Sequence, residues 1–237
     1  MIFSKSGYIK LLNNLKINYS FVYARDWKKY STKKNKIILR HDIDFDTSYA
    51  LEMAKIEYDN KIKSTFFFLM RDDYYDLYSN ETYNNIEKIK NYGHKIGIHI
   101  NPDSYKLYKK KVKIINSDIK YFQSFYNIKI DSISYHQPSV YNFKDIEFKS
   151  KFSSYSQDIM SKYKYFSDSS MNFRDKEFND FIKSQKNIQL LIHPIWWMIN
   201  KKSINQKIKS LFKKKKSDLI KIFKKYDTVI KIKNSYK

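Results

Sequence analysis

Short, strongly apolar runs separated by segments with helical spacing dominate this sequence. The runs at Ser64–Met70 (STFFFLM) and Ile188–Ile192 (IQLLI) are continuous enough to predict strands buried on both faces. Between such runs, apolar residues recur every three or four positions. Strands that alternate with helices predict a parallel sheet, open or closed into a barrel, within one α/β domain. Further strands are expected at Lys36–Arg40, Lys95–Ile100, Lys129–Tyr135, Tyr163–Phe166 and 228–233.

The rare histidines and prolines lie close to the predicted strand ends. The sequence has five histidines, of which only His94 sits at a strand start, where a structural role is expected. Proline is poorly tolerated inside central strands, so the three prolines mark strand exits. The C-terminal ends of parallel strands share one edge, where α/β folds bind ligands. A functional cluster is therefore predicted there, from His41, His99, His136, His193, Asp42, Asp44, Asp103 and Asp168.

The segment RHDID, which follows the first predicted strand, poses an electrostatic problem. Asp42 and Asp44 are two residues apart, so in an extended chain they point the same way. Two neighbouring carboxylates repel each other, and burial adds a desolvation cost. A bound cation, a shared proton or full solvation would relieve the repulsion, and the segment alone does not choose among them.

An ordered set of motifs resembles the polysaccharide deacetylases of carbohydrate esterase family 4. The motifs are ILRHDIDFD, STFFFLM, GHKIGIH, SYHQPS, SDSS and LLIHPIWW, between about Lys36 and Trp197. They are most similar to a divergent branch associated with surface-polysaccharide biosynthesis. The resemblance implies a distorted (β/α) barrel of about seven strands that holds one divalent metal, most often zinc.

The resemblance also implies roles for the residues in the first two motifs. Asp42 would be the general base and Asp44 a metal ligand, although the intervening Ile43 leaves their order open. His99 would be the first metal-binding histidine. The second histidine place, four residues on, falls on Asp103 instead. Two carboxylates and one imidazole suit zinc, iron or manganese.

The later motifs supply the remaining site residues that the resemblance implies. His193 would be the general acid, and Asp168 is the nearest candidate for the residue that orients the base. Trp196 and Trp197 would line the sugar site, with core packing as the alternative. His41 would be a third ligand or would orient Asp44. Substrate contacts would come from Pro138 and from His136, which could instead support the metal site, in a motif that has His136 and Gln137 where basic residues are usual.

The function that follows is metal-dependent removal of an N-acetyl group from an amino sugar of a surface-polysaccharide or other glycan precursor. This is hydrolysis of a carbon–nitrogen bond other than a peptide bond. Because Asp103 stands where a histidine is usual, a catalytically impaired glycan-binding relative is one alternative. A basic polyanion-binding protein is another, because the net charge is +23.

The charge itself indicates a general lysine bias more than a nucleic-acid site. Only four of the 47 basic residues are arginine, the better residue for bidentate phosphate recognition. No specific nucleic-acid partner is expected, whereas a basic amphipathic helix at about 203–225 could contact an anionic membrane surface. No export signal or apolar stretch long enough to span a membrane is found in the sequence, so a cytoplasmic location is expected.

Overall fold

The structure, a computed structural model, describes residues 2–28, 35–71, 73–137, 152–173, 175–184 and 186–235, without the side chains of 175 and 227–235. It divides into two compact units, Met1–Met198 and Ile199–Lys237. The first unit carries the predicted barrel and every candidate site residue. The second contains one long helix and is described separately below.

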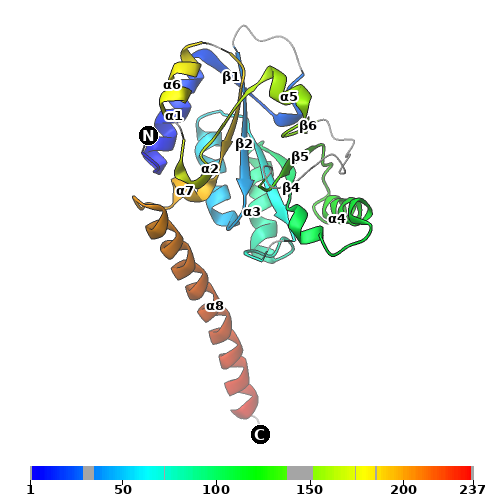
Figure 1. Cartoon of the computed structure of the whole chain (residues 1–237). Coiled ribbons are helices and arrows are strands. Elements are labelled where there is room, and N and C mark those ends of the chain that lie inside the picture. The colour runs from blue at the N-terminus through cyan, green and yellow to red at the C-terminus, as the bar shows by residue number, and fades with distance from the viewer. Residues whose placement is uncertain are drawn as a thin grey trace. The chain divides into compact units, whose positions relative to one another are not determined.

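All paired strands of the first unit run parallel, in a sheet that curls into an open half-barrel (Figure 1). The order is β6-β5-β4-β3-β2-β8-β7, and β1 pairs with the first part of β2. This confirms the predicted α/β barrel of about seven strands. The strands are β1 (Tyr19–Val22), β2 (Asn35–Ile43), β3 (Thr65–Met70), β4 (Lys95–Ile100), β5 (Ser132–Tyr135), β6 (Phe152–Ser153), β7 (Lys164–Ser167) and β8 (Ile188–Ile192).

Helices connect the strands, and several begin with a side-chain cap. Ser79 Oγ accepts from the Thr82 amide at the start of α3. Asp46 caps α2, since its carboxylate accepts a hydrogen bond from the Ser48 amide at 2.9 Å. In the first unit the helices are α1 (Lys5–Asn18), α2 (Thr47–Asp59), α3 (Asn80–Asn91), α4 (Lys111–Phe125), α5 (Gln157–Lys162), α6 (Asp175–Lys183) and α7 (Pro194–Met198).

The central strand β2 continues three residues past its expected end at Arg40, because His41, Asp42 and Ile43 also belong to it. Its side chains alternate between the two faces of the sheet. Ile38 points inward and joins Phe67 of β3 and Phe152 of β6, two strands that are not neighbours and meet only across the barrel. The side chains of Ile38, Phe67 and Phe152 thus form an apolar cluster, the apolar plug, that fills this part of the barrel interior. Further along the same inward row come Arg40, Asp42 and Asp44, where the strand leaves the apolar core.

Gly97 of β4 allows the sheet to pack closely against this plug. It pairs with Phe67, and a Cβ atom added at Gly97 would lie 2.5 Å from two carbons of the Phe67 ring and 3.0 Å from the Ser132 carbonyl oxygen. No real side-chain carbon tolerates such a contact with a ring, so the phenyl group occupies the space that a side chain at 97 would need.

The second unit is dominated by α8 (Ile204–Ser235), a helix of 32 residues. It begins with a capping box in which the Gln206 amide donates to Ser203 Oγ at 3.3 Å while Gln206 Oε1 accepts from the Ser203 amide at 3.4 Å. The strand expected at 228–233 is wrong, because these residues continue α8. Among the described residues, no helix has both the length and the apolar character needed to cross a membrane.

Candidate active site and metal centre

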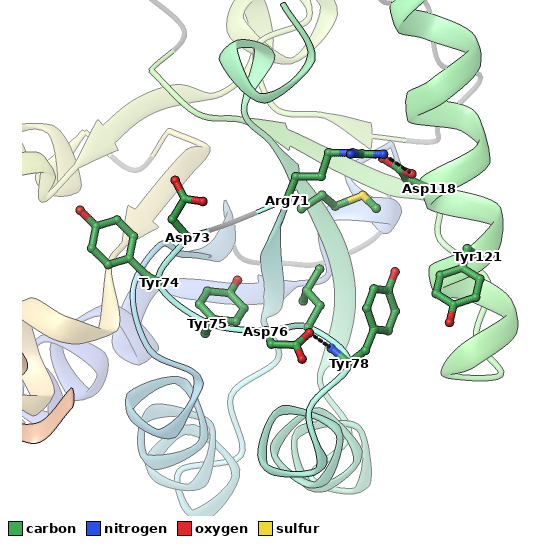
Figure 2. Close-up of a pocket in the computed structure, with 10 residues that line it drawn as sticks. Arg71, Asp73, Tyr74, Tyr75, Asp76, Tyr78, Asp118 and Tyr121 are labelled. Atoms are coloured by element: carbon green, nitrogen blue, oxygen red, sulfur yellow. Dashed lines mark hydrogen bonds and ion pairs between the residues drawn. The ribbon is translucent and has the colours of Figure 1, made fainter. Parts of the chain in front are cut away.

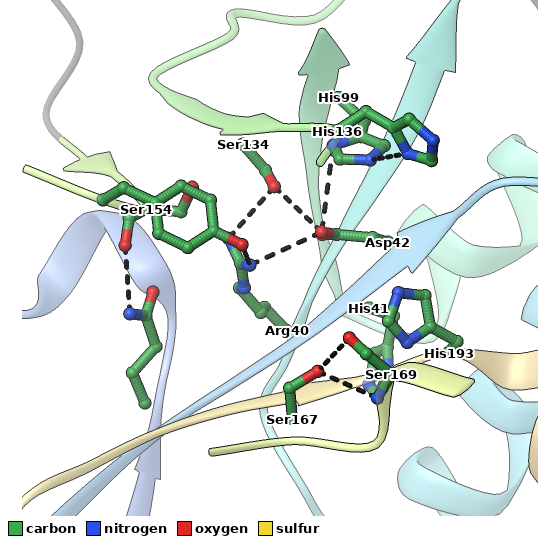
Figure 3. Close-up of polar contacts among 12 residues, drawn as sticks. Arg40, His41, Asp42, His99, Ser134, His136, Ser154, Ser167, Ser169 and His193 are labelled. Carbon is green, nitrogen blue, oxygen red and sulfur yellow. Dashed lines mark hydrogen bonds and ion pairs between the residues drawn. The ribbon is translucent and has the colours of Figure 1, made fainter. Parts of the chain in front are cut away.

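The C-terminal edge of the half-barrel gathers most of the predicted site residues. Asp42 lies near the end of β2 and Asp44 one residue past it, while His99 is the penultimate residue of β4. The remaining residues directly follow their strands: His136 follows β5, Asp168 follows β7 and His193 follows β8. Figure 3 shows the imidazoles of His99 and His136 on one side of Asp42 and that of His193 on another.

Three of these side chains form a compact triangle of potential metal ligands, Asp44, His99 and His136. Asp44 Oδ1 lies 3.3 Å from His99 Nε2 and 3.5 Å from His136 Nδ1. The two nitrogens are 3.2 Å apart. Ligand atoms bound at about 2.0–2.1 Å around a tetrahedral ion lie about 3.3–3.4 Å from one another. The triangle therefore has the dimensions of a divalent-metal site with a further position open.

The electrostatics of the triangle also suit a cation. Asp44 Oδ1 is buried and has no hydrogen-bond donor among the described residues. Burial opposes ionisation of Asp44, but contacts with His136 and His99 hold the pKa of its carboxyl well below the ordinary value. Asp44 in turn raises the pKa of His136. An ionised carboxylate with an unused oxygen, next to two imidazole nitrogens, is a donor set that a divalent metal fits.

Asp42 lies beside the triangle, with its Oδ2 3.8 Å from His99 Nδ1, and is held by a polar pair in the barrel interior. Its Oδ2 accepts a hydrogen bond from Ser134 Oγ at 3.0 Å and lies 3.5 Å from Arg40 Nη2. Arg40 also donates to Ser134 and to the hydroxyl of Tyr155, whose ring it covers at 5.0 Å. The other oxygen, Oδ1, is buried and has no hydrogen-bond partner among the residues that the structure describes. One oxygen of the Asp42 carboxylate is thus held in place while the other makes no hydrogen bond to them.

His193 is oriented by Asp168, which is fully buried. The carboxylate accepts from His193 Nδ1 at 2.6 Å, from the His193 amide at 3.0 Å, and from Trp197 Nε1 at 2.7 Å. Burial alone would lower the pKa of His193, but Asp168, with smaller contributions from Asp44 and Asp42, raises it to about 9. The ring thus presents Nε2, 3.7 Å from Asp44 Oδ2, as a protonated donor at neutral pH.

Several expected site residues lie elsewhere. Asp103 is exposed on a short 3-10 helix (Pro102–Tyr105) and is not among the three clustered ligands, whereas His136, expected to contact substrate, is. Trp197 packs in the core against Tyr8 and Phe3, and Trp196 is buried as well. Neither indole presents a free face for a sugar, and Trp197 instead supports Asp168. Pro138 lies outside the described residues.

His41 is a clear correction, since it faces the opposite side of β2 from the two aspartates. Its Nδ1 contacts the Ile192 carbonyl oxygen at 3.1 Å and its Nε2 lies 2.7 Å from Glu57 of α2. Glu57 is fully buried and also accepts from the hydroxyls of Tyr8 and Ser64. Alternation along the strand therefore makes His41 part of a structural network rather than a ligand or a support for Asp44.

The loops around this edge carry most of the unusual backbone conformations of the described residues. Of six residues other than glycine with positive φ, Arg71 follows β3, Gln137 follows β5, and Ser170 and Met171 follow β7. Such conformations cost energy and persist where the surroundings impose them, often at functional sites. Their concentration here agrees with the position of the polar cluster.

A pocket of about 620 Å³ opens in the loop after β3, beside this edge (Figure 2). The Arg71 guanidinium spans it to Asp118 of α4 at 2.6 Å, and Tyr78 packs edge-to-face on Tyr121 at 4.9 Å between ring centroids. The Tyr75 hydroxyl ties the loop to β2 by donating to the carbonyl oxygen of Ile43, between the two aspartates. The lining residues are Met70, Arg71, Asp73, Tyr74, Tyr75, Asp76, Leu77, Tyr78, Asp118 and Tyr121.

Sequence reasoning missed Arg40, Ser134 and Tyr155, which surround Asp42. The signal for Arg40 was present: the period of two that aligns Asp42 with Asp44 also places Arg40 on the same face. Ser134 lies on β5 and Tyr155 just beyond β6, and nothing in their local sequence points to a strand so distant in the chain.

Comparison with solved structures gives the class of fold. A mutant of a CE4 family pseudoenzyme superposes with a TM-score of 0.50 at 14% identity, over 79% of this chain and 64% of that one. The chitin deacetylase of Colletotrichum lindemuthianum gives 0.49 at 14% identity, over 76% and 81% of the two chains. A family 4 carbohydrate esterase from Bacillus anthracis gives 0.45 at 16%, over 90% and 92%.

The superposition on the CE4 family pseudoenzyme therefore shows that the curled half-barrel has the CE4 deacetylase-like fold. The chain spans less than two thirds of the length of the pseudoenzyme chains that it matches. No protein-family profile matches the sequence, and no curated protein matches it either.

Proposed function

We propose that this protein is a metal-dependent hydrolase that removes the N-acetyl group from an amino sugar of a glycan or glycan precursor. The observation that carries the proposal is the triangle of Asp44, His99 and His136, with Asp42 on one side and His193 on the other. The set provides a metal site, a carboxylate that can accept a proton, and an imidazolium that can donate one. Hydrolysis of an amide needs all three functions.

A divalent metal bound by the triangle would polarise the acetyl carbonyl oxygen as a Lewis acid. Zinc is our first choice, because two imidazoles and one carboxylate at tetrahedral spacing suit it. Asp42 takes the proton of the attacking water on Oδ1, while Arg40 and Ser134 keep the carboxylate in place. His193 donates its Nε2 proton to the departing amine, which leaves poorly as an anion. Asp168 holds the His193 ring in the orientation that this transfer requires.

We propose that the tyrosine pocket after β3 binds a neighbouring sugar of the same glycan. Aromatic rings offer flat apolar faces to the C–H side of a sugar ring, and carboxylates accept hydrogen bonds from its hydroxyl groups. Tyr121 is 58% exposed, so its ring is accessible from solvent. A substrate of several sugars, of the kind found in surface-polysaccharide precursors, would use both the pocket and the metal site.

The test combines metal content with acetate release from N-acetylated oligosaccharides and from nucleotide-linked N-acetylhexosamines. We expect bound metal, acetate release that a chelator abolishes, and loss of release in Asp42→Asn and His193→Ala. Asp103→Asn is the matched control, since it changes an exposed carboxylate on the same edge and should retain activity. A metal-free chain, or Asp42→Asn at full activity, would overturn the proposal. Sugar binding without acetate release would identify a catalytically impaired relative.

A separate variant tests the tyrosine pocket. Tyr121→Ala should raise KM for oligosaccharides severalfold and leave the rate on a single N-acetylated sugar unchanged. Tyr58→Ala, which removes another exposed ring from α2, is its control. An equal loss on long and short substrates would show that the pocket does not hold a second sugar.

A further inference from the structure

We propose that α8 is an interfacial anchor that lies along an anionic lipid surface. The helix carries a row of large apolar side chains that face water. Phe212, Leu219, Ile222, Phe223 and Tyr226 are between 50% and 71% exposed. A contiguous exposed apolar face of this kind is unusual in a soluble protein and indicates a surface that something covers.

The spacing places this apolar row on one side of the helix. Leu219, Ile222, Phe223 and Tyr226 are related by steps of three, four and seven residues, and Phe212 precedes Leu219 by seven. At about 100° of rotation per residue, all of them fall within an arc of roughly a third of the helix circumference. Lys213, Lys221 and Lys224 fall on the other side. Lys215 falls within the arc, where its long side chain can extend its charge toward water or lipid headgroups. The exposed helix is therefore amphipathic along the part whose side chains are described.

The charge of α8 is far more one-sided than that of the chain as a whole. Over Ile204–Ser235 the helix has eleven lysines and two acidic residues, whereas the whole chain has 47 basic and 24 acidic residues. One of the two acids, Asp218, pairs with Lys214 at 3.7 Å and Lys221 at 3.1 Å. The helix is thus more basic relative to its acids than the chain as a whole. At the surface of an acidic bilayer, the apolar row would contact the lipid acyl chains and the lysines would contact the anionic headgroups.

Pairing with a second copy fits the same stripe less well. Phe212, Leu219 and Tyr226 repeat every seven residues, as in a coiled coil. However, Lys215 falls within the seam, and Lys209, Lys216 and Lys225 border it, so two copies would bring lysines together with few acids to offset them. A nucleic acid would attract the lysines but would leave the apolar row in water. An anionic lipid surface satisfies both features together.

The test measures co-sedimentation of the full chain with vesicles. We expect binding to vesicles of phosphatidylcholine mixed with phosphatidylglycerol, little binding to phosphatidylcholine alone, and weaker binding as salt rises. Leu219→Glu should weaken binding at least tenfold, because it places a charge in the middle of the apolar row. Ile220→Glu is the matched control, since it adds the same charge one position away, outside the row. It should weaken binding far less.

Three results would overturn this inference. One is equal binding to the neutral and the anionic vesicles, and another is an equal effect of Leu219→Glu and Ile220→Glu. The third is a chain that light scattering shows to be a dimer which Leu219→Glu converts to a monomer, since this would assign the row to contact between copies. None of these measurements depends on deacetylase activity, so the anchor and the proposed reaction can fail separately.

Discussion

Replacing Asp168 by asparagine tests how the structure prepares His193 for proton donation. The pKa of His193 is about 9, compared with 6.5 for an ordinary histidine. The gap of about 2.5 pH units corresponds to about 3 kcal/mol of stabilisation of the imidazolium. Burial works against this stabilisation, so it comes mainly from Asp168, which contacts Nδ1 at 2.6 Å. In Asp168→Asn we expect the pKa of His193 to fall to 6.5 or below.

Nuclear magnetic resonance of the histidine Cε1–H groups in chelator-treated protein gives this pKa directly. His94 serves as an internal reference, because burial lowers its pKa and it lies outside the site. Asp103→Asn is the matched control and should leave the His193 titration unchanged. A pKa for His193 near 6.5 in the unaltered protein, or no decrease in Asp168→Asn, would refute the reasoning.

The same pair makes stability depend on pH with a definite sign. The pKa of His193 is raised in the folded state, so its contribution to the free energy of unfolding is complete below pH 6.5 and disappears as the pH rises through about 9. The difference in unfolding free energy between the unaltered protein and Asp168→Asn should therefore narrow across that interval. Urea unfolding of the metal-free proteins at several pH values measures it, and a constant difference would contradict the assignment.

Three further predictions concern the metal triangle and the packing around it. Asp44→Ala should abolish bound metal, measured by mass spectrometry, whereas Asp103→Ala should leave the metal content unchanged; equal losses would restore Asp103 as a ligand. Glu57→Gln should lower the urea-measured free energy of unfolding by about 3 kcal/mol, because it breaks a buried charged network, and an unchanged value would refute that role. Gly97→Ala should lower the melting temperature, with a cost of about 1–3 kcal/mol from overlap with the Phe67 ring, and an unchanged melt would show that the ring moves freely.

The barrel and much of its polar edge could be predicted because their signals are local. Predominantly apolar runs mark β4 and β8 at the observed residues, since both strands are buried over nearly their whole length. Histidines and aspartates next to these runs fall at the C-terminal edge because parallel strands must end there together. This reasoning placed Asp42, Asp44, His99 and His193 near one another without any structure.

The errors occur where the outcome depends on distant contacts. β2 continues through Ile43 because Arg40 and His41 have buried polar partners on other strands and helices. The local sequence does not reveal these partners. The family resemblance implied that Asp103 is a ligand, but the chain turns into a 3-10 helix at Pro102 and leaves that side chain exposed. His136 takes the third place because β5 lies beside β4, and this adjacency is a property of the sheet rather than of the sequence near His136.

The alternation of β2 means that one strand serves two buried polar networks on opposite faces. A slip of one residue that carried Asp42 to the place of His41 would bring two buried carboxylates, Asp42 and Glu57, together and would put the apolar Ile43 where Asp42 lies now. The Glu57 network, which lies on the face opposite the candidate metal site, therefore helps to fix the register of β2. The geometry of the proposed active site is thus protected partly by an energetic penalty on the wrong strand alignment, which arises on the opposite face of the sheet.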